Sequence, residues 1–393
     1  MKLLSIITLS TLTATAVQAS IFEPAPVKLG DGFSIVPQLE TDVYSNSNLY
    51  TDESDVNSSI IYVVEPSMTF GVDDGINRYG GNYALTSGSY SYDNDDNYLD
   101  HDFNLFGHTE FTERHRTDIG FGFVNKHENR GSGYTEDDAS TYDEPLKYNQ
   151  LFGKLYYQYG VATALVNLGG GVRYDVREYQ NFTSDTEENN FDKLTLSVDA
   201  EYQIGAITYL TADFNRADIK YKYDDTKDNI NNVWTVGGYW KGTGKTVGSA
   251  KFGYQYKAFD DASNDDFSGS TVDLGIGWKP IEYSNFELHF VRSAEESGSD
   301  SDADYILTNA GSLNWEHNWN EKIDSNVGLV YRVDDYVGLS RKDTTGSVSV
   351  ALIYEITRWM KVRSGYQFTN KNSTASDISY DRNLFNLGLT VAL

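Results

Sequence analysis

The chain of 393 residues carries 58 acidic against 31 basic side chains, so its formal net charge is −27, and it contains 30 tyrosines and no cysteine. The acidic balance argues against nucleic acid as a partner. The lack of cysteine excludes a disulfide framework, a thiol nucleophile and a Cys-ligated metal.

Residues 1–19 predict a signal peptide, because Lys2 precedes a short apolar run and small residues end at Ala19, where we expect cleavage. The run is too short, and too interrupted by Thr and Ser, for an anchoring helix. Removing Lys2 with this peptide would take the formal charge from −27 to −28. After Ala19 no run of about 20 apolar residues occurs, which excludes a helical membrane protein. Residues 20–32, with Pro24 and Pro26, are expected to form a short periplasmic N-terminal arm.

Residues 33–393 alternate polar and apolar side chains, the pattern of strands with one wet and one apolar face. Repeated many times, such strands predict an all-β transmembrane barrel of the antiparallel up-and-down type, with about eighteen strands. The expected strands are 33–46, 58–72, 77–92, 97–112, 116–128, 147–160, 163–177, 190–204, 208–222, 231–242, 246–258, 269–280, 284–294, 305–319, 325–334, 344–356, 360–371 and 379–393.

The connections alternate between tight turns and longer, acidic segments, of which 129–146 is the longest. Short periplasmic turns and long extracellular loops are typical of outer-membrane barrels of Gram-negative bacteria. A soluble sandwich could also alternate, but eighteen strands of this length with one-sided loops would be unusual. The acidic loop clusters, such as Glu136-Asp137-Asp138, are expected to be solvated or to meet divalent ions that bridge lipopolysaccharide. None has the EF-hand spacing, so no metal site is assigned.

Tryptophans provide a separate indication of a membrane. Trp240, Trp278 and Trp319 end strands on the apolar face next to short turns, and Trp359 lies in such a turn. Indole rings prefer the headgroup region, so these four residues predict the girdle at the inner leaflet.

The inward face supplies candidate solute contacts, because a barrel of this size leaves an aqueous channel. Arg173 and Arg177, with Lys154 and Lys193 on flanking strands, are the candidates for an anionic solute. They could also pair across strands and stiffen the wall. Tyr148, Phe152 and Tyr156 share one inward face and would suit sugar rings. The alternative is that they support an inward-folded loop.

Signals of catalysis are weak. The histidines form no HExxH pair, and the chain has neither a GxSxG elbow nor a phosphate loop. His127 with Glu128 lies near the expected outer rim, where barrel hydrolases act, but the sequence offers no partner serine. We therefore expect no enzyme, no catalytic residues and no cofactor.

The stretches Phe33–Leu39, Asp42–Asn48 and Asn383–Leu393 resemble the first strand, first loop and last strand of the putative β-barrel porin 2 family. The terminal Leu393 departs from the commoner Phe of barrel ends. Members of this family are outer-membrane barrels often associated with capsule and exopolysaccharide clusters. The resemblance implies export of a polysaccharide through the lumen, with periplasmic export components as partners.

Two other functions stay open. A diffusion porin for small solutes or oligosaccharides would be favoured by a long loop folded into the lumen. A lectin-like barrel that holds surface polysaccharide would have a closed lumen and an aromatic outer rim. The loop 129–146, with Tyr134 and Tyr142, decides between them. We expect a monomer in contact with outer-membrane lipid and lipopolysaccharide.

Overall fold

The computed structural model describes residues 21–30, 32–161, 163–242, 244–297 and 303–393. Within these residues eighteen antiparallel strands form a closed wall, which confirms the predicted barrel. The expected signal peptide lies outside the described residues. The wall strands are β2 (Phe33–Asn46), β3 (Ser59–Asp73), β4 (Arg78–Tyr90), β5 (Tyr98–Thr112), β6 (His115–Glu128), β7 (Leu146–Tyr159), β8 (Val166–Tyr179), β9 (Phe191–Gln203), β10 (Thr208–Tyr221), β11 (Asn229–Trp240), β12 (Thr246–Phe259), β13 (Phe267–Ile281), β14 (Ser284–Glu296), β15 (Tyr305–Asn320), β16 (Ile323–Val337), β17 (Arg341–Thr357), β18 (Met360–Ser373) and β19 (Tyr380–Ala392).

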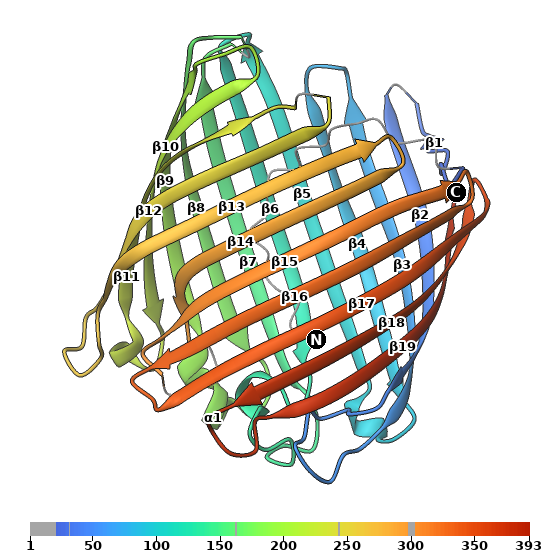
Figure 1. Cartoon of the computed structure of the whole chain (residues 1–393), viewed down its shortest axis with the longest axis vertical. Coiled ribbons are helices and arrows are strands. Elements are labelled where there is room, and N and C mark those ends of the chain that lie inside the picture. Colours follow the sequence, from blue (N-terminus) through green and yellow to red (C-terminus); the bar gives the residue numbers. More distant parts are fainter. Residues whose placement is uncertain (1–20, 31, 162, 243, 298–302) are drawn as a thin grey trace.

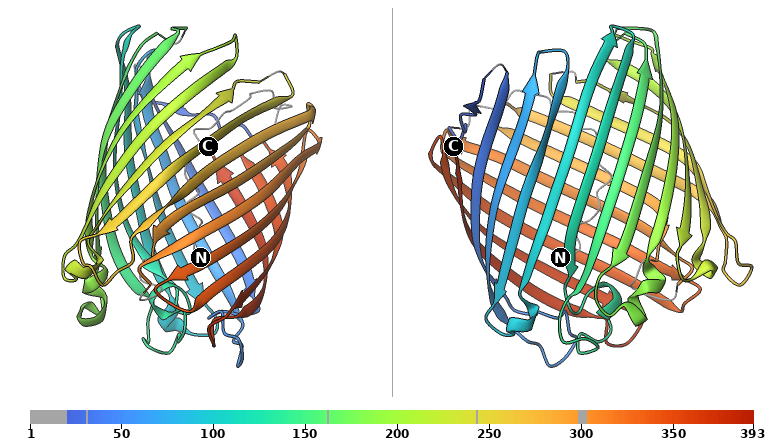
Figure 2. Two further views of the ribbon diagram at one scale, coloured as in Figure 1. Left: turned by 60° about the vertical axis from the view of Figure 1, so that its left-hand side comes forward. Right: turned by 180° about the vertical axis from the view of Figure 1, so that it is seen from behind.

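Each wall strand pairs with its neighbours in sequence, and the barrel closes where β19 pairs with β2. In that seam Leu384 lies opposite Asn46, and Ala392 lies opposite Gln38. The strands cross the molecule obliquely and surround one lumen, as the views from different sides show (Figures 1 and 2). In the described part of the chain, no helix has the length and apolar character needed to cross a membrane.

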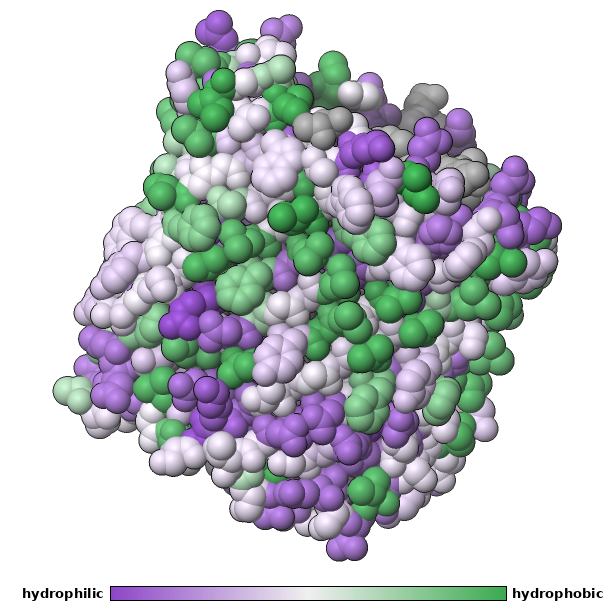
Figure 3. All heavy atoms as spheres, viewed as in Figure 1, coloured by the Kyte–Doolittle hydropathy of each residue, from purple (hydrophilic) through white to green (hydrophobic). Residues whose placement is uncertain are grey.

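The period of two in the sequence becomes an outer apolar face and an inner polar face. On β19, Phe385 and Leu387 point outward and are 55% and 58% exposed. Between them Asn386 points inward and donates to Asp42 of β2 at 3.2 Å. Apolar side chains accordingly gather over the middle of the face that Figure 3 shows. This outer face is stable only in lipid, because water would contact its apolar rows.

Short turns lie at one end of the barrel and longer connections at the other, which is the lower end in Figure 1. The long connections contain α1 (Thr183–Thr186) and the single 3-10 turns η1 (Asn94–Asp96), η2 (Gly133–Thr135), η3 (Glu187–Asn189) and η4 (Asp225–Lys227). By the usual arrangement of outer-membrane barrels, the long-loop end is extracellular.

The predicted strand boundaries differ from the observed ones by at most three residues, and one connection is shorter than expected. The sequence suggested a connection at 335–343, but β16 extends to Val337 and β17 begins at Arg341. Within the residues that were predicted as a connection, Arg341 and Asp343 form an ion pair of 2.6 Å on β17. Polar residues therefore continue the two strands to the rim.

The expected N-terminal arm folds back onto the barrel. Its short strand β1 (Val27–Lys28) pairs with Ile35 and Ser34 of β2. Further toward the N-terminus, the backbone N–H of Phe22 donates to Glu355 at 2.8 Å, and the ammonium of Lys361 lies 4.4 Å from the Phe22 ring centre. Glu355 and Lys361 share the inward face of β17 and β18 near the short-turn end. Phe22 thus lies at the periplasmic opening of the lumen.

Candidate functional site

The longest connection, residues 129–145 between β6 and β7, crosses the extracellular mouth and is called the strap below. Its residues contact the loop 47–58, the loop 91–97, the loop 180–190 and the inner rim of β17 and β18. Along the wall, β18 is separated from β6 by β19, β2, β3, β4 and β5. The strap therefore lies across part of the mouth and does not stand above its own strands.

The first fastening of the strap is Arg130. Its guanidinium donates to Asp96 at 2.7 Å, to Asp93 at 2.5 Å and to the Tyr50 hydroxyl at 2.6 Å. Burial by itself would lower the pKa of Arg130. The hydrogen bonds to Asp96 and Asp93 have the larger combined effect, so the pKa of Arg130 is raised. The pKa of Asp93 is lowered, first by the backbone N–H of Asp95 and also by Arg130. Both groups therefore stay ionised at neutral pH.

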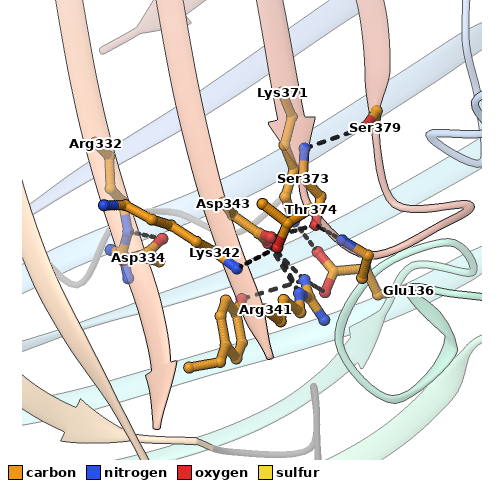
Figure 4. Close-up of polar contacts among 12 residues, drawn as sticks. Glu136, Arg332, Asp334, Arg341, Lys342, Asp343, Lys371, Ser373, Thr374 and Ser379 are labelled. Atoms are coloured by element: carbon orange, nitrogen blue, oxygen red, sulfur yellow. Dashed lines mark hydrogen bonds and ion pairs between the residues drawn. The ribbon is translucent and has the colours of Figure 1, made fainter. Parts of the chain in front are cut away.

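The tip of the strap docks on the opposite wall through Glu136. One carboxylate oxygen of Glu136 accepts from the Arg341 guanidinium at 2.6 Å, and the other accepts from the Lys371 ammonium. Asp343 lies 2.6 Å from Arg341 and 2.9 Å from Lys371. Figure 4 shows Glu136 reaching from the strap into this group on β17 and β18.

The four charged groups are withdrawn from water. Asp343 is 1% exposed, Arg341 8%, Lys371 9% and Glu136 14%. Two carboxylates balance two cations, and the Ser373 hydroxyl donates to Asp343 at 2.6 Å. Burial of charge is costly unless every group is paired, so the arrangement is stable only while Glu136 is in place. The cluster therefore couples the strap position to the wall.

Glycines allow the strap to approach its neighbours closely. At Gly131 the backbone has φ 75°, and an added Cβ would lie 1.7 Å from the Tyr50 carbonyl oxygen. At Gly133, with φ 59°, an added Cβ would overlap the Glu128 carboxylate. Other residues would be strained in this conformation and would collide there. These two positions fix the turn that directs residue 136 toward β17.

The second half of the strap packs on the loop 180–190. The Tyr142 ring stacks on Phe182 with centroids 4.3 Å apart, and its hydroxyl donates to Asp185 at 2.9 Å. Tyr142 forms a buried cluster with Leu146 and Tyr179. The strap is therefore fastened at its start, its tip and its end, and its aromatic rings face one another.

Of the predicted solute contacts, Tyr148 packs against the end of the strap, and Arg177 lies over Tyr148. Tyr148 packs against the cluster of Tyr142, Leu146 and Tyr179. The Arg177 guanidinium lies 4.8 Å from the Tyr148 ring centre and donates to Gln150 at 2.9 Å. For Tyr148 the geometry favours the alternative interpretation, support of an inward-folded loop.

Deeper in the lumen, Phe152 and Tyr156 lie on the wall itself. The Arg173 guanidinium stacks over Phe152 at 4.1 Å and also donates to Asp175 at 2.6 Å. Tyr156 donates its hydroxyl to Asp199 at 2.9 Å. Arg173 keeps a side-chain exposure of 40%, so its open face remains in contact with the lumen.

Lys154 and Lys193 complete the predicted set. Lys154 is exposed, stands opposite Arg173 in register and extends over Gly120. Lys193 is half-buried opposite Asp175, which is already paired with Arg173. Neither lysine makes an ion pair within the described ranges. Together with Arg173 they form a basic wall patch, defined here as Lys154, Arg173 and Lys193.

The four predicted girdle tryptophans lie at the short-turn end. Trp278, Trp319 and Trp359 are exposed by 46%, 60% and 42%, and Trp240 is half-buried. The Trp319 ring N–H donates to Ser325 at 3.0 Å. Indoles at the short-turn end suit a membrane interface, and their role as a girdle stays a prediction.

The histidine that suggested a hydrolase is engaged on both ring nitrogens. His127 Nδ1 lies 2.9 Å from Asp100, and Nε2 lies 3.0 Å from Asn129. Among the contacts of the described residues, His127 has no serine hydroxyl as a partner. The ring is held as part of the rim, stacked on Tyr98 at 3.7 Å.

Sequence reasoning missed Glu136, Arg341, Asp343 and Lys371. Glu136 begins an acidic run that was expected to be solvated, and only Asp137 and Asp138 of that run are exposed. Arg341 and Asp343 fell in the supposed loop 335–343. A local signal did exist, because Arg341 and Asp343 stand two residues apart and share one face of a strand.

The family model described as putative beta-barrel porin 2 matches residues 19–393. No functionally curated protein matches the sequence significantly.

Solved structures show the same fold at low sequence identity. Pseudomonas aeruginosa OpdK with vanillate is 12% identical, with 91% of this chain and 99% of that chain covered and a TM-score of 0.51. Pseudomonas aeruginosa OccK2 (OpdF) is 10% identical, with 91% and 98% covered and a TM-score of 0.53. Acinetobacter baumannii OccAB2 is 10% identical, with 95% and 99% covered and a TM-score of 0.53.

Proposed function

Because the chain belongs to the putative beta-barrel porin 2 family and folds as a porin-like channel of a Gram-negative outer membrane, we propose that it is a passive diffusion porin for small solutes. The strap narrows its extracellular mouth, and the basic wall patch offers weak contacts below it. Conduction needs binding that is weak enough for a solute to leave again.

The observation that carries this proposal is the docking of Glu136 on Arg341 and Lys371. A loop folded inward across the mouth sets an upper limit on the size of what passes. A polysaccharide in transit needs a mouth that stays open until the whole polymer has passed. The docked strap therefore favours the passage of small solutes, and not the polymer export that the family resemblance implied.

The lectin-like alternative receives less support from the aromatic residues. Tyr142 is 7% exposed and stacks on Phe182, and Tyr50 and Tyr90 lie in another buried cluster. Rings that pack against one another are not displayed for a sugar ligand.

The basic wall patch suggests which solutes to test first. Phe152 under Arg173 presents an aromatic face with a cation, and Lys154 adds a second exposed cation. An aromatic carboxylate suits such a combination. The OpdK structure contains vanillate, a ligand of this kind, although that likeness concerns the fold alone.

The proposal is tested with the purified barrel in liposomes. Swelling rates are measured with neutral sugars of increasing size and with benzoate and vanillate. We expect entry of monosaccharides and aromatic carboxylates and a sharp cut-off for longer oligosaccharides. Polysaccharide is then compared at the cell surface and in the periplasm of a deletion strain. Loss from the surface with accumulation in the periplasm would establish export and overturn the small-solute proposal.

A further inference from the structure

The outer, lipid-facing surface of β14–β18 contains a groove of about 550 Å³, a volume in the range of ligand pockets. Its lining is mostly apolar and includes Leu288, Gly311, Leu313, Tyr331, Gly346 and Phe368. Figure 3 shows this side of the barrel from outside, with hydrophobic side chains gathered over the front strands and hydrophilic ones toward the long-loop end. The groove is separate from the lumen described above.

The side chains of each strand point alternately outward and inward, and this shows on which side of the wall the groove lies. Leu288 is 49% exposed, Tyr331 60% and Val348 42%, and these residues belong to the outward rows of β14, β16 and β17. The inward row of β16 carries the Arg332–Asp334 ion pair, and the inward row of β17 carries the Arg341–Asp343 ion pair. The groove therefore opens toward the membrane.

Two glycines form the floor of the groove. In register, Gly311 of β15, Tyr331 of β16 and Gly346 of β17 form one outward row. An added Cβ at Gly346 would meet nothing within 4 Å, and one at Gly311 would meet only the His289 carbonyl oxygen at 3.9 Å. The Tyr331 ring therefore covers neither glycine.

This openness differs from the usual reason for glycine beside an aromatic residue in a sheet, in which the ring folds over the glycine. Gly248 illustrates the usual case, because an added Cβ there would lie 2.3 Å from the Trp240 ring. At Gly311 and Gly346 the packing of this chain does not require glycine. The missing side chains leave space on both sides of Tyr331.

A cation stands at the extracellular edge of the groove. Arg292 lies on the outward row of β14, beyond Leu288 and Phe290 and four residues before the strand ends at Glu296. Its guanidinium donates to the neutral amide of Asn309 at 2.9 Å. In the part of the chain that the structure describes, Arg292 has no carboxylate partner. A lipid-facing arginine raises the free energy of the folded barrel at the membrane midplane but has little effect near the interface, where an anion can pair with it.

We propose that this groove binds a phosphate-bearing glycolipid of the outer leaflet, such as the lipid A part of lipopolysaccharide. One acyl chain lies over Gly311 and Gly346 beside Tyr331, and a phosphate group accepts from Arg292 and Asn309. The charge of Arg292 favours an anionic occupant near the outer membrane interface, and the phosphate of such a glycolipid supplies that charge.

The test measures lipid retention by the intact barrel in native mass spectrometry. The probes are bisphosphorylated lipid A and the same lipid A without phosphates. Gly346→Leu fills the groove, and Arg292→Gln removes the charge. The matched controls are Gly153→Leu, at an outward glycine of β7 with nothing within 4 Å of its Cβ position, and Arg216→Gln, at an outward arginine of β10 that also bonds an asparagine, Asn232.

We expect Arg292→Gln to weaken binding of bisphosphorylated lipid A about fivefold, as for one arginine at an anionic headgroup. Gly346→Leu should weaken both probes, and neither control should weaken either. Equal retention by all four variants would overturn the proposal. It would also be overturned if the wild type were an oligomer that Gly346→Leu dissociates, because the groove would then be an interface between copies.

Discussion

The Glu136 carboxylate in the extracellular strap lies 2.6 Å from the guanidinium of Arg341, a residue 205 positions later in the chain. This contact, with the one to Lys371, holds the strap against the far wall of the mouth. A single carboxylate thereby links the longest loop to the rim of β17 and β18. Its removal should change the entrance without altering the strands.

Glu136→Gln should increase single-channel conductance and admit larger solutes. Removing one partner of a buried ion cluster costs about 3–5 kcal/mol, since the remaining charges lose their balance. The released strap should spend more time away from Arg341 and Lys371. Planar-bilayer recordings and liposome swelling provide the measurements. Asp137→Asn is the control, because Asp137 is exposed beside Glu136. Identical conductance in both variants would contradict the role of the docking contact.

Acidification should weaken the attachment at the start of the strap, where Arg130 pairs with Asp93. The pKa of Asp93 is lowered by the Asp95 N–H and by Arg130, so its stabilising contribution is present at neutral pH and is lost as the pH falls through that lowered value. We expect large-conductance events to become more frequent only at pH values below the ordinary pKa of an aspartate, as Asp93 becomes protonated. Asp93→Asn should show such events already at pH 7. A variant indistinguishable from the wild type at both pH values would refute this fastening.

Lys154→Gln should reduce preference for anions. Lys154 is an exposed cation of the lumen wall beside Arg173, and its charge attracts anions that enter the lumen. The reversal potential in a potassium chloride gradient should shift toward cation preference. Lys147→Gln serves as a control, because Lys147 lies at the rim and pairs with Glu144 at 2.6 Å. A larger shift for Lys147→Gln would place the selectivity at the rim.

Phe22→Ala should open the periplasmic side. The Phe22 ring lies under the Lys361 ammonium, and the Phe22 N–H bonds Glu355, so the arm occupies part of the opening. Loss of the ring should remove the cation–π contact, worth about 0.5–2 kcal/mol, and raise conductance modestly. Val27→Ala, in the paired part of the arm, should have no such effect. Conductance unchanged by Phe22→Ala would show that the arm does not limit flow.

Leu387→Arg should block assembly in the membrane. Leu387 faces outward with 58% exposure, and an arginine near the midplane of the lipid face costs roughly 2–4 kcal/mol. Folding into liposomes, followed by the heat-dependent shift in gel mobility, measures the loss. Gln367→Arg places the same charge on the inner face of β18 and should assemble. Normal insertion of Leu387→Arg would refute the facing of β19.

The barrel could be predicted because its signal is local. Phe385, Leu387 and Leu389 show their facing within one strand, and the same period recurs in every strand. The connection predicted at 335–343 is shorter in the structure, because charged residues at the rim such as Arg341 and Asp343 resemble a loop when each is considered alone. Residues two apart lie on the same face only in a strand, so the Arg341–Asp343 pair can be predicted only after a strand has been assigned there.

The strap could not be predicted, because its partners are distant in sequence. Nothing near Glu136 distinguishes it from Asp137 and Asp138, which are exposed as expected. Glu136 and Arg341 come into contact only when the whole wall has closed. The amino-acid composition does not indicate which distant residues then become neighbours. The same holds for Phe22, whose partner Glu355 lies 333 positions away. Aromatic residues at alternate positions indicated an inward face but not whether Tyr148 would meet solute or strap.

The seam between β2 and β19 has a consequence for biogenesis. Gln38 pairs with Ala392, so the wall cannot close before the last strand of the chain is available. Until then two strand edges and all outward rows stay exposed, which favours aggregation between chains in transit. A net charge of −27 makes copies repel one another. We therefore expect the excess carboxylates of the loops to reduce aggregation between chains until the last strand pairs with the first.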